Sequence, residues 1–347
     1  MPGRGQGTYR ARMQLLTDQD RTVNQRLDAE LEKVEGRFAA ELISDLPCVN
    51  ALVSHIEQYR GKMLRPRLVL VAAMACTDAD EPLNDAHCVL ATVVEMVHMA
   101  TLVHDDILDD ADVRRRGRTI NDLEGNETAI MLGDFLISHA YHLCSSLSDP
   151  RISRTIADTT NTVCEGELLQ LANRNNRQLD EQTYFEIIRR KTASLCGTCC
   201  WLAASLAGGD DEVADGLYEY GERVGVAFQI VDDLLDLVGL EDTVGKSLGR
   251  DLQKGKLTLP LIRHLMTAAE PARQQLADLL DRVPAGLDPD QVSAIRQLII
   301  ASGSVEYAND WASRLVEQAK TPLARLPDTP ARGQLARIAD TVLTRKS

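Results

Sequence analysis

The feature that most constrains the fold is a helical periodicity that runs through almost the whole chain. Apolar residues recur at spacings of three and four, whereas the alternating pattern of a half-buried strand is scarce. Glycine and proline fall mainly between these stretches, and Gly208-Gly209 predicts a turn. A loop is expected at 240–256. The predicted helices lie at about 18–45, 48–60, 64–77, 83–111, 125–147, 151–173, 181–207, 210–239, 257–268, 271–282, 289–301, 303–323 and 330–345.

The chain is expected to form one domain behind a short tail. Residues 1–16 are polar and rich in glycine, which predicts a disordered N-terminal tail. No linker or shift in composition divides residues 17–347, and the 44% of hydrophobic residues in the chain can fill one large core. We therefore expect a single all-α bundle of roughly ten or more helices, with the long apolar helices 83–111 and 181–207 at its centre.

The charge balance restricts the partners. A formal net charge of −14 disfavours binding to nucleic acid or anionic lipid, and a phosphate-bearing ligand would need metal ions or a local basic patch. We found no apolar run near the roughly 18–20 residues that span a bilayer, so no transmembrane segment is expected. The polar N-terminus does not resemble a secretory signal, and we expect a cytoplasmic protein.

The first acidic cluster ends a long apolar stretch. Asp105 and Asp109 are four residues apart and Asp112 follows three residues later, so the three carboxylates share one helix face. Like charges at this spacing destabilise a helix by about 0.2–0.5 kcal/mol per pair, a cost that a bound cation would relieve. Magnesium prefers a few carboxylates together with substrate phosphates. Taken alone, the cluster could also be a solvated helix end.

A second cluster repeats this pattern. Asp232 and Asp236 are again four residues apart on an apolar helix, with Asp233 beside them. Two unrelated solvated ends would rarely share both spacing and setting. Two facing acidic helices could hold several magnesium ions and, through them, a diphosphate.

Basic residues occur between and beside the two clusters. Arginine matches the geometry of a phosphate group and lysine supplies a mobile positive charge. Each would by default be a solvated surface residue, so their value lies in combination. They are Lys62, Arg65, Arg114, Arg115, Arg116, Lys191, Lys246 and Lys256.

In these segments the sequence resembles the trans-polyprenyl diphosphate synthases, the enzymes that elongate isoprenoid chains. The family usually has Gly-Gly-Lys-Arg where this chain has Arg60-Gly61-Lys62-Met63, and Arg-Arg-Gly where it has Arg114-Arg115-Arg116. The matching segments follow the family order and include Gly61-Lys62-x-x-Arg65-Pro66, Glu95-x-x-His98-x-Ala100-Thr101-Leu102-x-His104-Asp105-Asp106-x-x-Asp109, Glu165-Gly166-Glu167, Lys191-Thr192-Ala193, Phe228-Gln229-x-x-Asp232-Asp233-x-x-Asp236, Gly245-Lys246 and Gly255-Lys256-x-Thr258-Leu259-Pro260.

The resemblance implies an isoprenoid synthase fold around a central apolar cavity, a homodimer, and magnesium as cofactor with three ions per active site. An allylic diphosphate would lie between the clusters, and isopentenyl diphosphate beside Lys62 and Arg65. The implied metal ligands are Asp105, Asp106, Asp109, Asp232, Asp233 and Asp236. The implied catalytic residues are Asp105, Asp109, Lys191, Asp232 and Lys246. The implied substrate-binding residues are Lys62, Arg65, His98, Arg114, Arg115, Lys191, Thr192, Gln229, Lys246 and Lys256.

The helix before the first cluster is expected to line the product tunnel. Relatives with short products commonly carry bulky aromatics four or five residues before the first aspartate, where this chain has Thr101 and Ala100. Met96 lies about one turn deeper. Because these side chains are not aromatic, the resemblance predicts a medium- or long-chain all-trans product.

Three alternatives remain open at this stage. A class I terpene cyclase shares the first motif, but its second motif usually carries Asn, Ser and Glu. A metal-dependent phosphohydrolase would use His98 and His104-Asp105, yet it would leave the basic residues without a role. A catalytically silent subunit of a two-chain synthase would be expected to lack motif carboxylates, and all are present.

Overall fold

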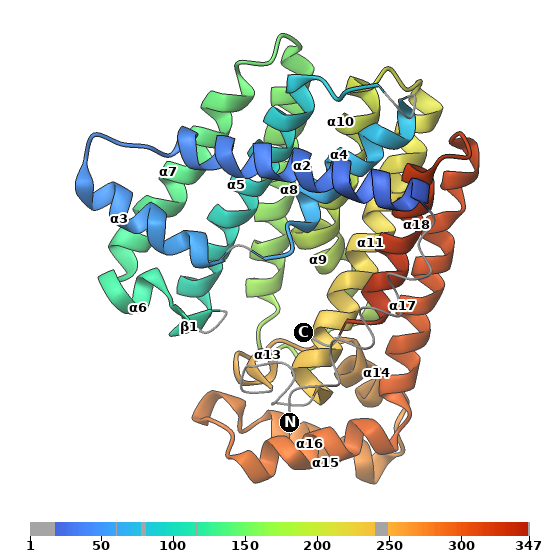
Figure 1. Cartoon of the computed structure of the whole chain (residues 1–347). Coiled ribbons are helices and arrows are strands. Elements are labelled where there is room, and N and C mark those ends of the chain that lie inside the picture. The colour runs from blue at the N-terminus through green and yellow to red at the C-terminus, as the bar shows by residue number, and fades with distance from the viewer. Residues whose placement is uncertain (1–17, 60, 78–80, 115–116, 240–248, 346–347) are drawn as a thin grey trace, which may run out of the picture.

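The computed structural model of the 347-residue chain describes residues 18–59, 61–77, 81–114, 117–239 and 249–345. The described part is a bundle of helices with one two-residue hairpin, β1 (Val113–Arg114) and β2 (Gly117–Arg118), as Figure 1 shows. The elements of the first half are α2 (Asp18–Glu41), α3 (Pro47–Ile56), η1 (Glu57–Tyr59), α4 (Leu64–Cys76), α5 (Asp85–Leu108), α6 (Ile120–Glu124), α7 (Asn126–Cys144) and α8 (Pro150–Ala172). Those of the second half are α9 (Glu181–Ile188), η2 (Arg189–Ala193), α10 (Ser194–Leu206), α11 (Asp211–Val238), α13 (Arg250–Gln253), α14 (Leu259–Thr267), α15 (Glu270–Leu280), η3 (Val283–Ala285), α16 (Pro289–Ala301), α17 (Ser304–Lys320), η4 (Pro322–Arg325) and α18 (Pro330–Leu343).

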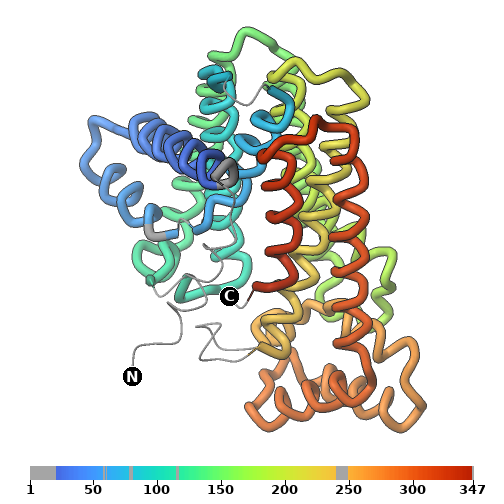
Figure 2. Tube along the Cα trace, turned by 45° about the vertical axis from the view of Figure 1, so that its right-hand side comes forward, coloured from blue at the N-terminus to red at the C-terminus, as the bar shows by residue number. Residues whose placement is uncertain are grey.

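Two long helices organise the bundle. Helix α5 packs against α2, α4, α7 and α10, while α11 packs against α10, α17 and α18. Figure 2 shows α17 and α18 running alongside α11, with α15 and α16 across the base. The all-α architecture expected from the sequence is confirmed.

Three helices that supply side chains to the aspartate clusters and their partners start at side-chain caps. Asn84, Asp180 and Asp210 each accept a hydrogen bond from a backbone N–H in the first turn of α5, α9 and α11. Such caps satisfy donors that have no partner within the helix and contribute about 1 kcal/mol each. The sequence thus fixes where these helices begin.

Helices α10 and α11 approach each other closely at glycines. A Cβ atom on Gly221 would lie 2.4 Å from the carbonyl oxygen of Cys196, and one on Gly225 would lie 2.7 Å from Cα of Ala193. Real Cβ atoms do not approach this closely, so a larger residue would push the helices apart. These glycines allow the backbones to touch, and the contact fixes how α11 sits against the chain segment that carries Lys191 and Thr192.

The structure corrects four sequence expectations. The helix predicted at 181–207 is divided into α9, a π-helical turn (η2) and α10. The sequence reading also missed the hairpin and α6 between 113 and 124, and it placed α13 inside a loop. Helix α5 is long and apolar enough to cross a membrane, contrary to our reading, but 78% of its apolar window is buried in the bundle, as in a core helix. The predicted tail at 1–16 lies outside the described residues.

Candidate active site

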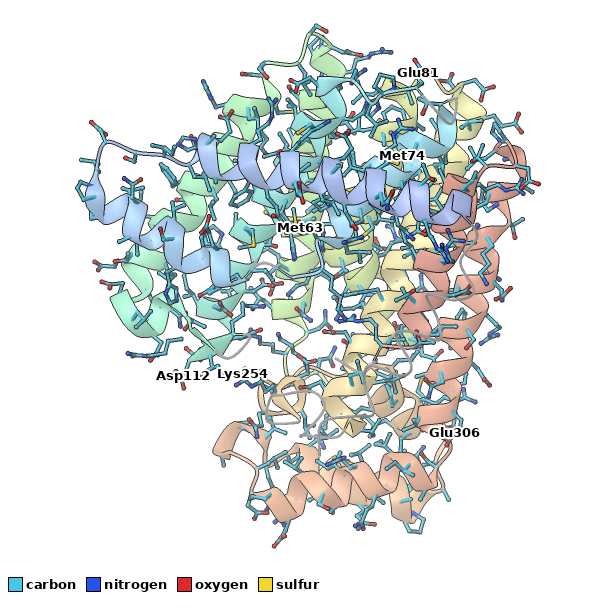
Figure 3. All side chains as sticks on the ribbon, viewed as in Figure 1. Met63, Met74, Glu81, Asp112, Lys254 and Glu306 are labelled. Atoms are coloured by element: carbon cyan, nitrogen blue, oxygen red, sulfur yellow. The ribbon has the colours of Figure 1, made fainter. Side chains whose placement is uncertain are left out.

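The two aspartate clusters lie at the same end of the bundle. Helices α5 and α11 both end near the hairpin and α13 (Figure 1). Arg250 of α13 donates to the carbonyl oxygen of Val113 at 3.3 Å, and Lys254 pairs with Asp110 at 3.1 Å. Figure 3 labels Lys254 and Asp112 at this end of the molecule. Residues far apart in the sequence therefore meet at one site.

The first cluster is held by cations from three other segments. Asp109 accepts hydrogen bonds from Lys256 Nζ at 2.8 Å and from Arg174 Nη2 at 3.0 Å. Asp105 lies 3.5 Å from Lys191 Nζ. These contacts balance the negative charge gathered at the end of α5, as the repulsion within the cluster requires.

Asp106 faces inward, away from its two neighbours in the motif. Its side chain is 2% exposed and forms a bidentate ion pair with Arg114, whose Nη2 lies 2.7 Å from Oδ1. Burial disfavours the charge of Arg114, but Asp106 outweighs this effect and raises the pKa of Arg114. The pair gives both residues a role inside the fold that the sequence did not indicate. Metal binding by Asp106 and substrate binding by Arg114 stay predictions.

Two of the three aspartates in the second cluster are held by hydrogen bonds from within the fold. Asp233 accepts hydrogen bonds from the hydroxyl of Tyr184 at 2.6 Å and from Nε2 of Gln229 at 2.8 Å. Asp236 accepts from the backbone N–H groups of Arg250 at 3.3 Å and Asp251 at 3.1 Å, so it ties α11 to the start of α13.

Asp232 is the exposed member of the second cluster. It lies 3.4 Å from Arg345 at the end of the described chain, and the Arg345 guanidinium lies 3.9 Å from the centre of the Phe228 ring. Burial lowers the pKa of Arg345, and the nearby Asp232 partly offsets this effect. The segment that follows α18 thus contacts α11 at the second cluster.

The acidic side chains fit a hard divalent cation. Burial, reinforced by Asp251, raises the pKa of Asp236 to about 7, and the same two causes raise the pKa of Asp233 well above its usual range. The raised pKa values mean that too little positive charge lies near these two carboxyl groups to stabilise their ionised form. A divalent cation would supply that charge. Among the described residues, no three potential ligands already form a metal cage. Magnesium does not need such a cage, because it uses one or two carboxylates together with substrate phosphates and water.

Lys191 stands between the first cluster and α8. It forms ion pairs with Asp105 and Glu167, and it donates to Gln170 at 3.0 Å. Burial lowers its pKa, but the charge of Asp105, followed by that of Glu167, outweighs burial and raises the pKa above its usual value. Its neighbour Thr192 donates to Oε1 of Gln229 at 2.9 Å. Lys191 is therefore a permanently charged group beside the aspartates.

Three of the residues predicted to bind isopentenyl diphosphate, Lys62, Arg65 and His98, lie within the described part of the chain. The buried Nε atom of Arg65 has no hydrogen-bond partner among the residues that the structure describes, and an anion would satisfy it. Lys62 lines a cavity of about 210 Å³ together with Asp28, Glu32 and Glu35 of α2. His98 is partly buried on α5. Arg115 and Lys246 lie outside the described residues.

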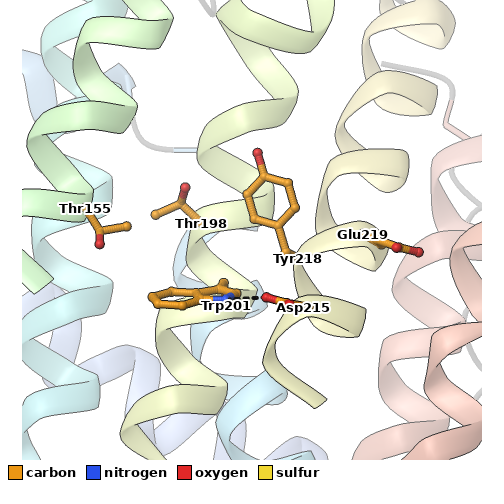
Figure 4. A pocket seen from close by; sticks show the side chains of 6 residues that line it. All are labelled: Thr155, Thr198, Trp201, Asp215, Tyr218 and Glu219. Carbon is orange, nitrogen blue, oxygen red and sulfur yellow. Dashed lines mark hydrogen bonds between the residues drawn. The ribbon is translucent and has the colours of Figure 1, made fainter. Parts of the chain in front are cut away.

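A second cavity does not contain the predicted site residues. It has a volume of about 490 Å³ and is lined by Thr155, Thr198, Trp201, Asp215, Tyr218 and Glu219 (Figure 4). Asp215 precedes Asp232 by 17 residues on the same helix, or about 25 Å at 1.5 Å per residue. This cavity is therefore distant from the aspartate clusters.

The sequence reading missed several residues that hold the site together. Glu167 and Asp251 lie in segments that carried the resemblance, Glu165-Gly166-Glu167 and Gly245-Lys246-x-x-Gly249-x-Asp251. The remaining residues carry no local signal, because they reach the site only through the tertiary fold. They are Gln170, Arg174, Tyr184 and Arg345.

Comparison with known proteins decides the family. Residues 47–299 match the polyprenyl synthetase family. The chain is 32% identical over 323 residues to octaprenyl diphosphate synthase of Escherichia coli, covering 93% of this chain and 98% of that protein. The chain belongs to the polyprenyl synthetase family.

The chain is also similar to other prenyl synthases. The chain is 34% identical over 312 residues to a short-chain isoprenyl diphosphate synthase of Methanothermobacter thermautotrophicus, covering 88% of this chain and 94% of that protein. The structure matches a polyprenyl synthase of Caulobacter crescentus, complexed with calcium and isoprenyl diphosphate, with a TM-score of 0.86 at 31% identity; the match covers 93% of this chain and 98% of that one.

We expect Arg114→Met to lower the free energy of unfolding by about 3 kcal/mol, because buried Asp106 would lose its bidentate partner. Urea denaturation measures the change. Arg118→Met is the matched control, since Arg118 pairs with Asp122 at the surface and should matter little. Equal effects of the two substitutions would contradict the importance of the buried pair.

Proposed function

We propose that this polyprenyl synthetase family member condenses isopentenyl diphosphate with allylic diphosphates to form a medium- or long-chain all-trans polyprenyl diphosphate. The observation that carries the proposal is the meeting of two aspartate clusters with Lys191 and Lys256 at one end of α5 and α11. The paired carboxylates would bind a diphosphate through metal ions, and the lysines would neutralise the negative charge of the departing diphosphate.

The six motif aspartates divide into two groups. Asp105, Asp109 and Asp232 keep part of their side chains accessible to solvent, and they would hold magnesium, three ions per site. Asp106, Asp233 and Asp236 are engaged by partners within the fold and would complete the site from behind. When bound, magnesium supplies Lewis-acid stabilisation of the diphosphate oxygens.

The basic residues would stabilise the leaving group. Negative charge grows on the allylic diphosphate as its carbon–oxygen bond breaks, so Lys191 and Lys256 would stabilise the transition state more than the ground state. Lys246 and Arg114 are proposed to act with them. Lys62, Arg65, His98 and Arg115 would bind isopentenyl diphosphate.

The reaction would proceed through an allylic cation. The double bond of isopentenyl diphosphate attacks this cation, a new carbon–carbon bond forms, and a proton is lost to the released diphosphate. Thr192 and Gln229 would direct their dipoles toward the cation. The bond from the Thr192 hydroxyl to Oε1 of Gln229 holds that amide in one orientation.

The alternatives lose support. The terpene cyclase and phosphohydrolase readings do not account for a polyprenyl synthetase match over residues 47–299. A silent partner subunit would not need the paired carboxylates and lysines that the structure brings together. The purified chain alone should therefore be active.

Purified protein incubated with magnesium, radiolabelled isopentenyl diphosphate and an allylic primer should give an extended polyprenyl diphosphate. We expect Asp105→Ala to lower kcat at least about a hundredfold while the fold persists, because one metal-binding carboxylate is lost. Asp158→Ala, at an exposed position on α8, is the control. A wild-type rate for Asp105→Ala at saturating magnesium would refute the assignment.

Product length is proposed to depend on the wall formed by α5. Met96 and Ala100 are fully buried, and Thr101 is partly buried with its hydroxyl bonded to the carbonyl oxygen of His98 at 2.7 Å. The small Ala100 leaves room for a growing chain beyond the first cluster. The similarity to an octaprenyl diphosphate synthase supports a long product.

Ala100→Phe should shorten the product, because a phenyl ring would close the tunnel beside the first cluster. Chromatography of the dephosphorylated products measures the chain length, and thermal unfolding shows what the substitution does to the fold. If Ala100 faces a tunnel, the ring fits; if it faces packed core, overpacking destabilises by about 1–3 kcal/mol. An unchanged product would refute this placement of the tunnel.

We also propose that the protein is a homodimer that works in the cytoplasm. Three large apolar side chains remain exposed on neighbouring helices, Ile130 and Met131 on α7 and Leu168 on α8, at 45%, 64% and 65%. A second copy would cover them. Light scattering should give twice the mass of one chain, and a monomer at micromolar concentration would contradict this proposal. Cell fractionation would test the location.

A further inference from the structure

A buried tyrosine holds the second aspartate cluster from behind. Tyr184 of α9 is 3% exposed, and its hydroxyl donates to Oδ2 of Asp233 at 2.6 Å. The other oxygen of Asp233 accepts from Gln229 at 2.8 Å. Short hydrogen bonds to a carboxylate are among the stronger ones in proteins. Both oxygens of Asp233 are thus engaged from within the fold.

These hydrogen bonds belong to a chain of four side chains that joins α11 to α9 at one end and to η2 at the other. Gln229 and Asp233 are four residues apart on α11, so they lie on one face. Tyr184 reaches Asp233, and the Thr192 hydroxyl reaches Gln229 at 2.9 Å. We call the four residues Tyr184, Asp233, Gln229 and Thr192 the tether.

The π-helical turn η2 explains how one helix supplies both ends of the tether. Tyr184 and Thr192 are eight residues apart, which in a regular α-helix leaves them about 80° apart around the axis. A π turn inserts about one residue without adding rotation, so the effective separation is near seven residues, or about 20°. The two side chains therefore face α11 together.

Close backbone contacts fix η2 on both sides. A Cβ atom on Gly166 of α8 would lie 2.5 Å from the backbone nitrogen of Lys191. One on Gly225 of α11 would lie 2.7 Å from Cα of Ala193. The turn is therefore pressed between α8 and α11, and the tether joins α11 to a segment that has little freedom to move.

We propose that Tyr184 is a positioning residue for the proposed condensation. By holding Asp233 and, through Gln229, Thr192, it sets the rotation of the last turns of α11, so that Asp232 keeps its orientation toward the diphosphate. This inference rests on the proposed function. It assigns Asp233 to support, whereas the sequence alone grouped it with the metal ligands.

The test compares two buried tyrosines that each lose one hydroxyl. Tyr184→Phe breaks the tether. Tyr220 lies elsewhere on α11, and Tyr220→Phe removes its 2.8 Å hydrogen bond to the carbonyl oxygen of Leu335 on α18. Each loss should cost about 1 kcal/mol of stability. The readouts are Mn²⁺ binding with inorganic diphosphate, followed by electron paramagnetic resonance, and kcat and KM for the condensation.

Tyr184→Phe should weaken Mn²⁺ binding about tenfold and lower kcat by a similar factor, as loss of a hydrogen bond to a metal-site carboxylate commonly does. Tyr220→Phe should leave both near wild type. Equal Mn²⁺ affinity in the two variants, or tighter binding by Tyr184→Phe, would overturn the proposal. Tighter binding would mean that Asp233, once released, is itself a ligand.

A second variant keeps the question answerable if Tyr184→Phe does not fold. Asp233→Asn retains an oxygen for Tyr184 but removes the negative charge. In a supporting role, it should weaken Mn²⁺ binding no more than about tenfold, whereas complete loss of binding would make Asp233 a ligand and refute the proposal. The wild-type assay separates this outcome from the proposed function. If the wild-type protein does not catalyse condensation but Tyr184→Phe still weakens Mn²⁺ binding about tenfold, only the proposed activity is refuted.

Discussion

The structure depends on the neutralisation of carboxylates that gather where α5 and α11 end. Neither helix carries the cations that its own aspartates need. Asp109 is met by Lys256 and Arg174, Asp105 by Lys191, and Asp232 by Arg345. Because each cation comes from a different segment, the charges can be balanced only when the turn after α8, η2, the segment after α13 and the residues that follow α18 are all in place. The same arrangement leaves the acidic groups ready to exchange these partners for metal ions and a diphosphate.

Rigidity at the site comes from close backbone packing. Glycines on α8 and α11 let both helices press against η2, which presents Lys191 and Thr192. A π turn in a helix is unfavourable by itself and is common at functional sites. Here it directs side chains at neighbouring positions toward different partners, with Lys191 against the first cluster and Thr192 against Gln229 of the second.

Within each cluster, burial separates residues that look equivalent in the sequence. Asp105 and Asp109 are partly exposed, whereas Asp106 is enclosed with Arg114. Asp232 is exposed, whereas Asp233 is enclosed with Tyr184 and Gln229. Adjacent residues on a helix point about 100° apart, so a motif of neighbouring aspartates must divide between the site and the core. This division is what turns a row of like charges into a site with distinct roles.

By itself the sequence determined the helical architecture, the caps that begin α5, α9 and α11, and the two aspartate faces, because all of these depend on residues within a few turns of one another. The basic residues beside the two clusters, together with the family resemblance, also pointed to the lysines at 191 and 256. The π turn, the partners Arg174 and Arg345, and the burial of Asp106 and Asp233 were decided only by the tertiary structure. Apart from the pair of Asp106 with Arg114, eight residues away, these features depend on contacts between segments separated by tens of residues or more, and no local pattern encodes which cation will reach which carboxylate.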